Sequence, residues 1–379
     1  VYSRISNPTN AVLEQRISAL EGGIGAIATA SGQAALHLAI ATLMGAGSHM
    51  VASTALYGGS HNLLHFTLRR FGIDTTFVPP GDHAAWRAAV RPNTKLFFGE
   101  TVGNPGLDVL DIEAVAAIAH AARVPLLVDS TLTSPWLIKP FELGADLVYH
   151  SATKFLSGHG TVIGGLVVDG GSFDWDASGK FAELTEPYAG FHNMVFSEES
   201  TVGAFLLRAR REGLRDFGAC MSPHTAWLIL QGIETLPLRM ARHMSNTEKV
   251  VEFLAAHPLV ARVGHPMLPG HPSHALAQKL LPRGAGSVFS FDLRGSRAQG
   301  QAFVEALQVF SHLANVGDCR SLVIHPASTT HFRMSDEALA AGGITQGTIR
   351  LSIGLEDPDD LIEDLKRALK AADKAGASA

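Results

Sequence analysis

Short apolar runs alternate with longer amphipathic stretches along the first half of the chain. The runs that predict buried strands are residues 49–53, 74–79, 95–100, 124–129, 146–151 and 161–169. The stretches that predict helices are residues 31–44, 59–71 and 111–122. Near-continuous apolar strands that alternate with helices are typical of the α/β class, with a mostly parallel sheet covered by helices on both faces. In such a sheet, ligands bind at the carboxyl ends of the strands.

A helix is also predicted near the start of the chain. The Asn-Pro-Thr segment at 7–9 supplies a turn and a cap, and the two glycines at 22–23 supply an end. Farther along, residues 222–257 predict a long helical stretch that is interrupted near Pro237.

The pattern changes beyond this stretch. Residues 286–293 alternate as a half-exposed strand does, residues 296–310 predict a helix, and residues 347–354 predict another strand. The last helical stretch starts with acids and ends with lysines, as the helix dipole favours. We therefore predict a large α/β domain, a helical connector and a smaller α+β domain, at residues 1–235, 236–256 and 257–379.

Composition narrows the class of protein. The 379 residues are 46% hydrophobic and 17% charged, which is enough apolar material for the cores of about two globular domains. A net charge of −5 with scattered basic residues argues against a nucleic-acid partner, and no apolar run is long enough to span a membrane. Cys220 and Cys319 are the only cysteines, so no disulfide framework is expected and a reducing cytoplasm fits best.

Polar residues stand at the ends of the predicted strands. Asp129 ends one of them, and Ser151, Thr153 and Lys154 follow the next. Upstream, the Ser-Gly-Gln segment at 31–33 opens a helix whose unpaired N–H groups can bind an anion. Singly, these residues have structural explanations as a solvated lysine, a turn-forming aspartate and a helix cap. Together they supply the amine, the carboxylate and the phosphate cradle that pyridoxal phosphate requires.

The chain resembles the Cys/Met-metabolism family of fold-type I pyridoxal-phosphate enzymes. The matching motifs are YSRISNPT (2–9), ASGQAA (30–35), LYGG (56–59), NPGLDVLDI (104–112), VDST (128–131), HSATKFLSGHG (150–160), SLVIHPASTTH (321–331) and RLSIGLED (350–357). The resemblance implies a mostly parallel sheet of the seven-stranded type and a smaller C-terminal α+β domain. Within the family, the chain is most similar to the sulfhydrylases that convert O-acetylhomoserine and sulfide to homocysteine and acetate.

The resemblance also implies the residues that hold the cofactor. Lys154 bonds it covalently and later moves protons, Asp129 pairs with its pyridine nitrogen, and Tyr57 stacks on its ring. Thr131 lies beside the ring. The phosphate is implied to lie among Ser31, Gly32, Gln33, Ser151 and Thr153, with Gly158 and Gly160 leaving room for the backbone nearby.

Two further sets of residues follow from the resemblance. Arg350, helped by Asn104 and Ser321, is implied to bind the α-carboxylate of the substrate by a bidentate contact. Tyr2 and Arg4 are implied to reach the phosphate in a neighbouring subunit, so that the active site is shared across a dimer and dimers pair into tetramers. The family's N-terminal arm extends upstream of these residues, so the arm is expected to be truncated here.

Several alternatives stay open. Within the family they are an O-succinylhomoserine sulfhydrylase or cystathionine γ-synthase, and then a methionine or cystathionine γ-lyase. Methionine γ-lyases carry a cysteine two residues after the stacking tyrosine, where this chain has Gly59, which disfavours the lyase. The GIGAIA segment (23–28) fits a dinucleotide-binding motif of an oxidoreductase, but it follows a predicted helix instead of a strand. A non-catalytic binding protein is the remaining class.

No metal site is expected. His61 and His65 stand four residues apart, as metal ligands on a helix can. Asn62 occupies the place where a zinc protease has its glutamate, and no third ligand is evident.

Overall fold

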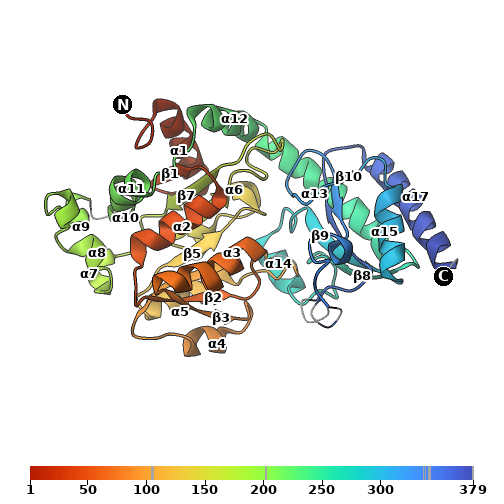
Figure 1. The fold of residues 1–379 in the computed structure, drawn as a ribbon, viewed down its shortest axis with the longest axis horizontal. Coiled ribbons are helices and arrows are strands. Elements are labelled where there is room, and N and C mark those ends of the chain that lie inside the picture. The colour runs from red at the N-terminus through yellow and green to blue at the C-terminus, as the bar shows by residue number, and fades with distance from the viewer. Residues whose placement is uncertain (104–105, 201–202, 336, 338, 340–342, 378–379) are drawn as a thin grey trace. The chain divides into compact units, whose positions relative to one another are not determined.

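The computed structural model, shown as a ribbon in Figure 1, describes residues 1–103, 106–200, 203–335, 337, 339 and 343–377. The chain forms two compact units. The N-terminal unit comprises Val1–Asn104, Asp108–Ser157 and Thr161–Glu234. The C-terminal unit comprises Thr235–Ala379 and the short segments Pro105–Leu107 and Gly158–Gly160.

The N-terminal unit is built on a seven-stranded sheet with the order β1-β7-β6-β5-β4-β2-β3. The strands are β1 (Gly25–Thr29), β2 (His49–Ser53), β3 (Asp74–Val78), β4 (Thr94–Glu100), β5 (Leu126–Asp129), β6 (Leu147–Ser151) and β7 (Gly165–Asp169). The ladder from β3 to β6 is parallel, and β7 pairs antiparallel with both β6 and β1. The predicted α/β class and the mostly parallel sheet are therefore confirmed.

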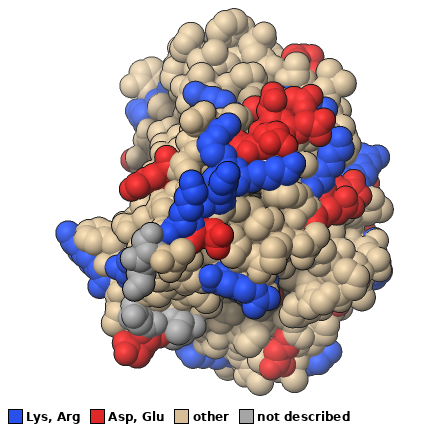
Figure 2. All heavy atoms as spheres, turned by 90° about the vertical axis from the view of Figure 1, so that its right-hand side faces the viewer, with Lys and Arg blue, Asp and Glu red and all other residues tan. Residues whose placement is uncertain are grey.

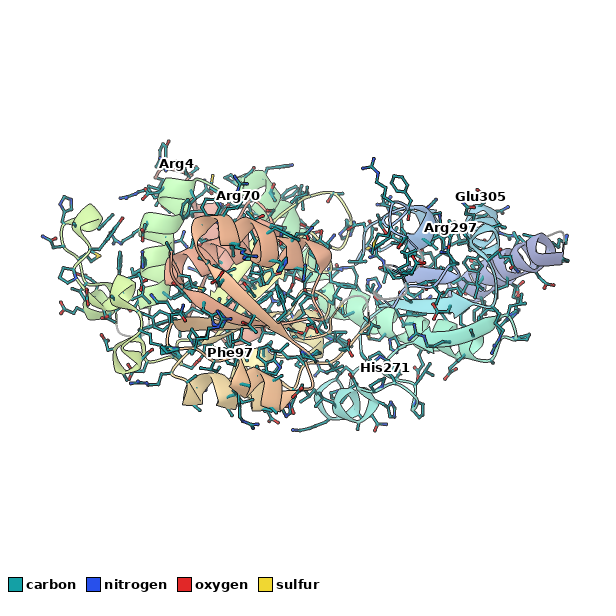
Figure 3. All side chains as sticks on the ribbon, turned by 60° about the horizontal axis from the view of Figure 1, so that its bottom comes forward. Arg4, Arg70, Phe97, His271, Arg297 and Glu305 are labelled. Atoms are coloured by element: carbon teal, nitrogen blue, oxygen red, sulfur yellow. The ribbon has the colours of Figure 1, made fainter. Side chains whose placement is uncertain are left out.

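Helices cover both faces of this sheet. Phe97 and Phe98 are consecutive residues of β4 and point to opposite faces, and both are fully buried. Phe97, labelled in Figure 3, packs against Trp86 of α4 (His83–Ala88) with the ring centroids 5.4 Å apart. Phe98 belongs to the core that also contains Leu36 of α2 (Gly32–Leu43). Because both faces are covered, the strands need the continuous apolar sequence from which they were predicted.

The predicted N-terminal helix is confirmed as α1 (Pro8–Glu21). Asn7 Oδ1 accepts a hydrogen bond from the Thr9 N–H at 3.0 Å, and Gly22 ends the helix in the left-handed conformation with φ of 84°. The GIGAIA segment runs from this helix into β1, which is the reverse of the strand–turn–helix order that a dinucleotide site requires.

The helix predicted at 59–71 is only partly correct. The segment forms α3 (Gly58–Asn62), then a π-helical turn (Leu63–Thr67) and a 3-10 turn (Leu68–Phe71). Leu64 and Leu68, which stand four residues apart, are both buried. Spacing of apolar residues indicates which side is buried but does not determine whether the backbone bonds run to the third, fourth or fifth residue.

The remaining helices of this unit connect or flank the strands. The predicted helix at 111–122 is α5 (Ile112–Ala121). The others are α6 (Ser134–Leu137), α7 (Trp175–Ser178), α8 (Ala182–Thr185), α9 (Phe196–Glu199), α10 (Ala204–Arg208), α11 (Arg215–Phe217) and α12 (Pro223–Glu234).

The C-terminal unit has a five-stranded sheet with the order β10-β11-β12-β9-β8. The strands are β8 (Val260–Gly264), β9 (Val288–Leu293), β10 (Ser311–His312), β11 (Leu322–Ile324) and β12 (Thr348–Ser352), and the helices include α13 (Leu236–Ala255), α14 (His274–Leu280), α15 (Arg297–Ala306) and α17 (Pro358–Ala377). The predicted long helical stretch breaks at Thr235, and Pro237 lies in the first turn of α13, where proline is tolerated.

The prediction that residues 286–293 form a half-exposed strand is wrong. In β9, Phe289 and Phe291 are buried, but so is the polar residue Asp292 that alternates with them. Its carboxylate accepts hydrogen bonds from Thr348 Oγ1 at 2.6 Å and Arg262 Nε at 2.9 Å. A polar residue in an alternating pattern can therefore face inward when partners from neighbouring strands satisfy it.

Charges of both signs lie side by side on the face shown in Figure 2. On α17, Lys366 pairs with Glu363 and Arg367 pairs with Asp364, each at 2.6 Å. The helix has acids in its first turn and Lys374 in its last, as predicted. Among the helices of the described residues, none combines the length and apolar character that crossing a membrane demands.

Candidate active site

The N-terminus of α2 lies directly against the end of β6. Ser31 caps the helix, since its Oγ accepts a hydrogen bond from the Ala34 N–H at 3.1 Å. A Cβ placed on Gly32 would lie 2.7 Å from Ser151 Cβ and 3.0 Å from Ser151 Oγ. The first turn of a 12-residue helix and a hydroxyl at a strand end therefore lie so close that no side chain fits between them, which is the geometry of an anion cradle.

We expect Gly32→Ala to weaken the binding of pyridoxal phosphate by about tenfold, because the added methyl group must push the helix away from Ser151. The measurement is the dissociation constant of the cofactor, titrated against the apo-protein. Gly45→Ala is the matched control, since Gly45 follows the opposite end of α2 and has no atom within 4 Å of the added Cβ. Equal affinity of the two variants would contradict the cradle.

Asp129 ends β5 and presents a buried carboxylate at the same edge of the sheet. Its side chain is only 7% exposed, and Oδ1 accepts a hydrogen bond from the Thr131 N–H at 2.8 Å. The pKa of Asp129 is raised above its ordinary value, because the effect of burial outweighs the lowering by hydrogen bonds from Thr131 and Tyr149. A buried carboxylate with two donors is suited to pair with one cationic group.

Thr131 connects the ends of the two strands. Its Oγ1 accepts a hydrogen bond from the Ser151 N–H at 2.8 Å, which holds the end of β6 next to the loop after β5. Because Ser151 also contacts Gly32, the residues predicted for the phosphate and for the pyridine nitrogen belong to one connected network.

Lys154 lies in a turn that begins where β6 ends, and its side chain is half-buried. Its backbone N–H donates to the Ser151 carbonyl at 3.2 Å. The Thr153 hydroxyl accepts from the Gly164 N–H at 3.1 Å, and the Ser157 hydroxyl donates to the Thr153 carbonyl at 3.1 Å. These bonds fix the turn from both sides, so the lysine is attached to a rigid support next to the cradle.

Tyr57 is held above the first turn of α3. Its backbone N–H donates to Glu100 Oε1 at 2.5 Å, and Gln33 Nε2 donates to the Gly59 carbonyl at 3.0 Å. Tyr57 is 53% exposed, and its ring lies over Gly59, where an added Cβ would overlap with the Cε1 atom of the tyrosine. A cysteine at position 59 would therefore require the tyrosine to move.

Sequence reasoning missed Glu100. It ends β4, is buried, and is the register partner of Asp129. The rule that singled out Asp129, a polar residue at the end of an apolar strand, applies equally to Glu100 and could have found it.

The residues predicted to reach a neighbouring subunit lie near the surface of their own chain. The Arg4 guanidinium donates to the Arg215 carbonyl and lies 5.0 Å from the centre of the Tyr2 ring. Tyr2 is 62% exposed, and Arg4 is labelled at the periphery of Figure 3.

The residues predicted to bind the substrate carboxylate are in the C-terminal unit or outside the described residues. Arg350 is a half-buried residue of β12 and pairs in register with Ile324 and Ser290. Ser321 is buried, and its Oγ donates to Glu356 at 2.8 Å and accepts from the Gly354 N–H at 2.8 Å. The hydroxyl proton of Ser321 is therefore already donated to Glu356. Asn104 lies outside the described residues.

Two glycines follow Lys154, and in the structure their backbone conformation and their packing both explain why glycine stands there. Gly158 and Gly160 have φ of 72° and 64°, a conformation that favours glycine. A side chain on Gly158 would overlap with the Arg239 guanidinium, and one on Gly160 with the Asp318 carboxylate. Within the C-terminal unit, the glycines allow close packing against these two charged groups.

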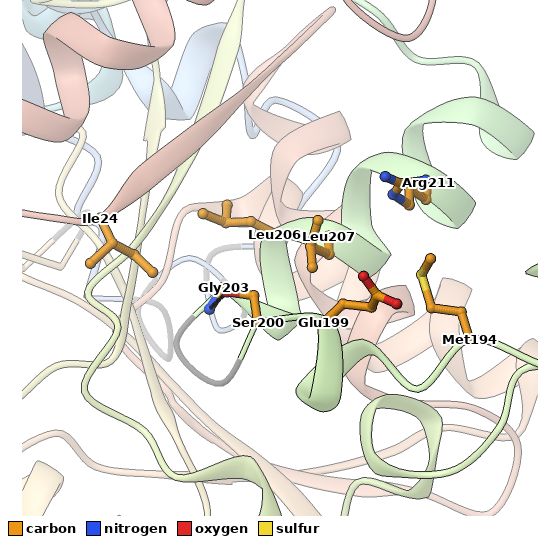
Figure 4. A pocket seen from close by; sticks show the side chains of 8 residues that line it. All are labelled: Ile24, Met194, Glu199, Ser200, Gly203, Leu206, Leu207 and Arg211. Atoms are coloured by element: carbon orange, nitrogen blue, oxygen red, sulfur yellow. Dashed lines mark hydrogen bonds between the residues drawn. The ribbon is translucent and has the colours of Figure 1, made fainter.

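A pocket of about 400 Å³ opens elsewhere in the N-terminal unit (Figure 4). Its lining residues are Ile24, Met194, Glu199, Ser200, Gly203, Leu206, Leu207 and Arg211. None of them is among the predicted site residues, so the pocket adds nothing to the cofactor site. No cluster of three potential metal ligands occurs within the described ranges of the chain.

The donor set at this sheet edge fits pyridoxal phosphate. A helix N-terminus next to a strand-end hydroxyl suits the phosphate, a buried aspartate suits the pyridine nitrogen, and a lysine on a rigid turn suits the covalent bond. Together with the parallel sheet, these features define a pyridoxal-phosphate-dependent enzyme of fold type I.

The chain belongs to the Cys/Met metabolism PLP-dependent enzyme family, whose model matches residues 1–370. The predicted family is confirmed, and the cofactor is pyridoxal 5′-phosphate.

Two relatives match almost the whole chain. The O-acetyl-L-homoserine sulfhydrylase of Leptospira meyeri is 48% identical over 379 residues, covering 98% of this chain and 86% of the relative. The homocysteine synthase of Schizosaccharomyces pombe is 46% identical over 374 residues, covering 98% of this chain and 87% of the relative.

Solved structures agree in fold. A putative O-acetylhomoserine (thiol)-lyase from Campylobacter jejuni, with pyridoxyl-lysine monophosphate in its chain, is 38% identical with a TM-score of 0.93. Cystathionine gamma-lyase from Lactobacillus plantarum, complexed with L-serine, is 34% identical with a TM-score of 0.84. Both comparisons cover 98% of this chain and 88% of the other chain.

Proposed function

We propose that this chain catalyses a γ-replacement in which sulfide displaces acetate from O-acetylhomoserine and homocysteine forms. The Cγ–O bond breaks, acetate leaves with the electron pair, and hydrosulfide supplies the pair for the new Cγ–S bond. The observation that carries this proposal is the similarity, over nearly the full length, to relatives named as O-acetyl-L-homoserine sulfhydrylases and homocysteine synthase.

The residues of the N-terminal unit supply the chemistry in this proposal. Bound pyridoxal phosphate supplies an electron sink that acidifies the Cα and Cβ hydrogens of the amino acid. The Lys154 amine, once substrate has taken its place, removes these protons in turn, as a mobile base on a rigid turn can. Asp129 keeps the ring nitrogen protonated, because a buried carboxylate favours a cation beside it.

The other residues orient the cofactor. The first turn of α2, from Ser31 to Gln33, together with the hydroxyls of Ser151 and Thr153, holds the phosphate, and Thr131 lies beside the ring. Tyr57 stacks on the ring, and its tether to Glu100 limits the motion of its backbone. Ser321 is tied to Glu356 in this structure, so its contribution to carboxylate binding in this proposal is to position the neighbouring backbone.

We expect Arg350→Ala to raise KM for O-acetylhomoserine about tenfold or more, because a bidentate contact with the α-carboxylate is lost. The colour of the bound cofactor should stay, and kcat should fall less than kcat/KM. Steady-state kinetics and absorbance spectra measure both. Arg262→Ala is the control, since Arg262 is 65% exposed on β8 and pairs with Asp292. An unchanged KM in Arg350→Ala would refute the carboxylate assignment.

The decisive experiment is an assay of products. O-acetylhomoserine and O-succinylhomoserine are each supplied with sulfide or with cysteine, and the products are identified. We expect homocysteine from the acetyl ester and sulfide. Cystathionine from cysteine would favour the γ-synthase, and release of 2-oxobutanoate with little homocysteine would favour a γ-lyase and defeat the proposal.

The proposal includes a site shared between two copies of the chain, with Tyr2 and Arg4 reaching the partner's cofactor phosphate and dimers pairing into tetramers in the cytoplasm. If so, mixing inactive Lys154→Ala with inactive Arg4→Ala subunits should restore about a quarter of the wild-type activity, because random exchange gives one intact site in half of the dimers. Recovery is measured after subunit exchange under mild denaturation. No recovery, in a sample shown to contain mixed dimers, would mean that each site is made by one chain.

A further inference from the structure

A buried tyrosine next to Asp129 has no role in the function proposed so far. Tyr149 of β6 is the register partner of Asp129, so the two side chains emerge next to each other on one face of the sheet. Tyr149 is 3% exposed, and a hydrogen bond from its phenol is one of the influences that lower the pKa of the Asp129 carboxylate. Ser60 Oγ lies 3.5 Å from the phenol oxygen, and the ring stacks on Phe98 at 6.0 Å.

The groups around Asp129 have opposing effects on its charge. Burial raises the pKa of Asp129, and its register partner in β4, Glu100, is a second buried carboxylate at this edge. Hydrogen bonds from Thr131 and Tyr149 lower the pKa of Asp129, and His150 of β6 lowers it further. The phenol itself stays protonated, since burial and the charges of Asp129 and Glu100 raise the pKa of Tyr149 well above its ordinary value. Tyr149 therefore keeps a proton that it can donate to Asp129.

We propose that Tyr149 is a positioning residue for the cofactor, whose phenol holds the Asp129 carboxylate ionised and oriented towards the place of the pyridine nitrogen. This inference rests on the role proposed above for Asp129. Thr131 donates to the carboxylate from the loop after β5, and Tyr149 lies beside Asp129 in register on β6, so in this proposal the two residues restrict rotation of the carboxylate from different sides. Ser60 of α3 in turn lies next to the phenol, so the orientation of Tyr149 is linked to the segment that carries Tyr57.

The test is the pH dependence of cofactor affinity in Tyr149→Phe, which keeps the ring and removes only the donor. Without the phenol, the pKa of Asp129 rises, so the carboxylate is protonated at a higher pH and cannot pair with the pyridinium. We expect the dissociation constant of pyridoxal phosphate to increase about tenfold at mildly acidic pH, with the acid limb of the binding profile moved upward in pH. At basic pH, where Asp129 is ionised in both proteins, the difference should shrink.

Two comparisons make the result specific. Tyr188→Phe is the matched control, since Tyr188 is a tyrosine away from the predicted site residues whose pKa is raised by burial and by the nearby carboxylate of Glu212, and its profile should match the wild type. In the Asp129→Asn background, Tyr149→Phe should change neither affinity nor pH dependence. An unshifted acid limb, or an equal loss of affinity with and without Asp129, would overturn the role of Tyr149. If Asp129→Asn alone left the cofactor affinity, its pH profile and the turnover unchanged, the result would instead contradict the role proposed for Asp129.

Discussion

Lys154→Ala is expected to abolish the absorbance band near ~420 nm and to lower turnover by at least about a thousandfold, because one amine both bonds the cofactor and moves the protons. The turn that carries this lysine is fixed by the backbone of residue 154 and by the hydroxyls of Thr153 and Ser157, all of which the substitution keeps. The substitution should therefore leave the fold intact. Absorbance spectra, a coupled assay of acetate release and thermal melting measure the three effects.

The control for this substitution is Lys139→Ala, a lysine of the same unit whose side chain is 42% exposed and lies 3.9 Å from Glu142. A surface pair of this kind contributes little to stability, so colour and turnover should both stay at the wild-type level. If Lys154→Ala kept the band while Lys139→Ala lost it, the covalent link would have been assigned to the wrong lysine.

Asp129→Asn is expected to keep the colour of the bound cofactor and to lower kcat by about a hundredfold, because a neutral amide no longer stabilises a charge that develops in the reaction. The covalent bond to Lys154 does not depend on this residue, whereas electron withdrawal by the ring depends on the proton on its nitrogen. Asparagine keeps the size of the side chain and can still accept from the Thr131 N–H and the Tyr149 phenol. Spectra and steady-state kinetics separate the retained link from the lost activity.

Asp74→Asn provides the matched comparison. Asp74 opens β3 at the amino edge of the same sheet and is exposed, so its substitution should change neither cofactor affinity nor kcat. Equal kinetics for the Asp129 and Asp74 variants would remove the carboxylate from the mechanism.

The meeting of the predicted cofactor residues at one edge of the sheet could be foreseen because these residues follow one topological rule. In a parallel sheet, successive carboxyl ends lie at one edge, so Asp129 at the end of β5 and Lys154 shortly after β6 lie at the same edge although they are 25 positions apart in the sequence. The helix start at Ser31 joins them because β1 and β6 both flank β7. Glu100 obeys the same rule and was overlooked.

Tyr149 could not have been found in this way. It stands inside the apolar run 146–151, where an aromatic residue predicts only a buried strand. Its hydroxyl has a role only because the register of β5 and β6 places it next to Asp129, and register is a property of the assembled sheet. The burial of Asp292 was missed for the same reason, since its partners are supplied by other strands.

The sequence by itself determined the class of fold, the family and the cofactor. Each apolar run and each motif is a short segment of sequence, so both can be recognised without a structure. The runs predict strands covered on both faces, and the motifs occur along nearly the entire chain. Only the tertiary structure decided which polar groups alter the pKa of Asp129 and how closely Gly32 packs against Ser151. It alone also showed that the hydroxyl of Ser321 is hydrogen-bonded to Glu356. The physical reason is that hydrogen bonds and close contacts of this kind join residues far apart in the chain, and their energies depend on distances and burial that arise only when the strands and helices pack.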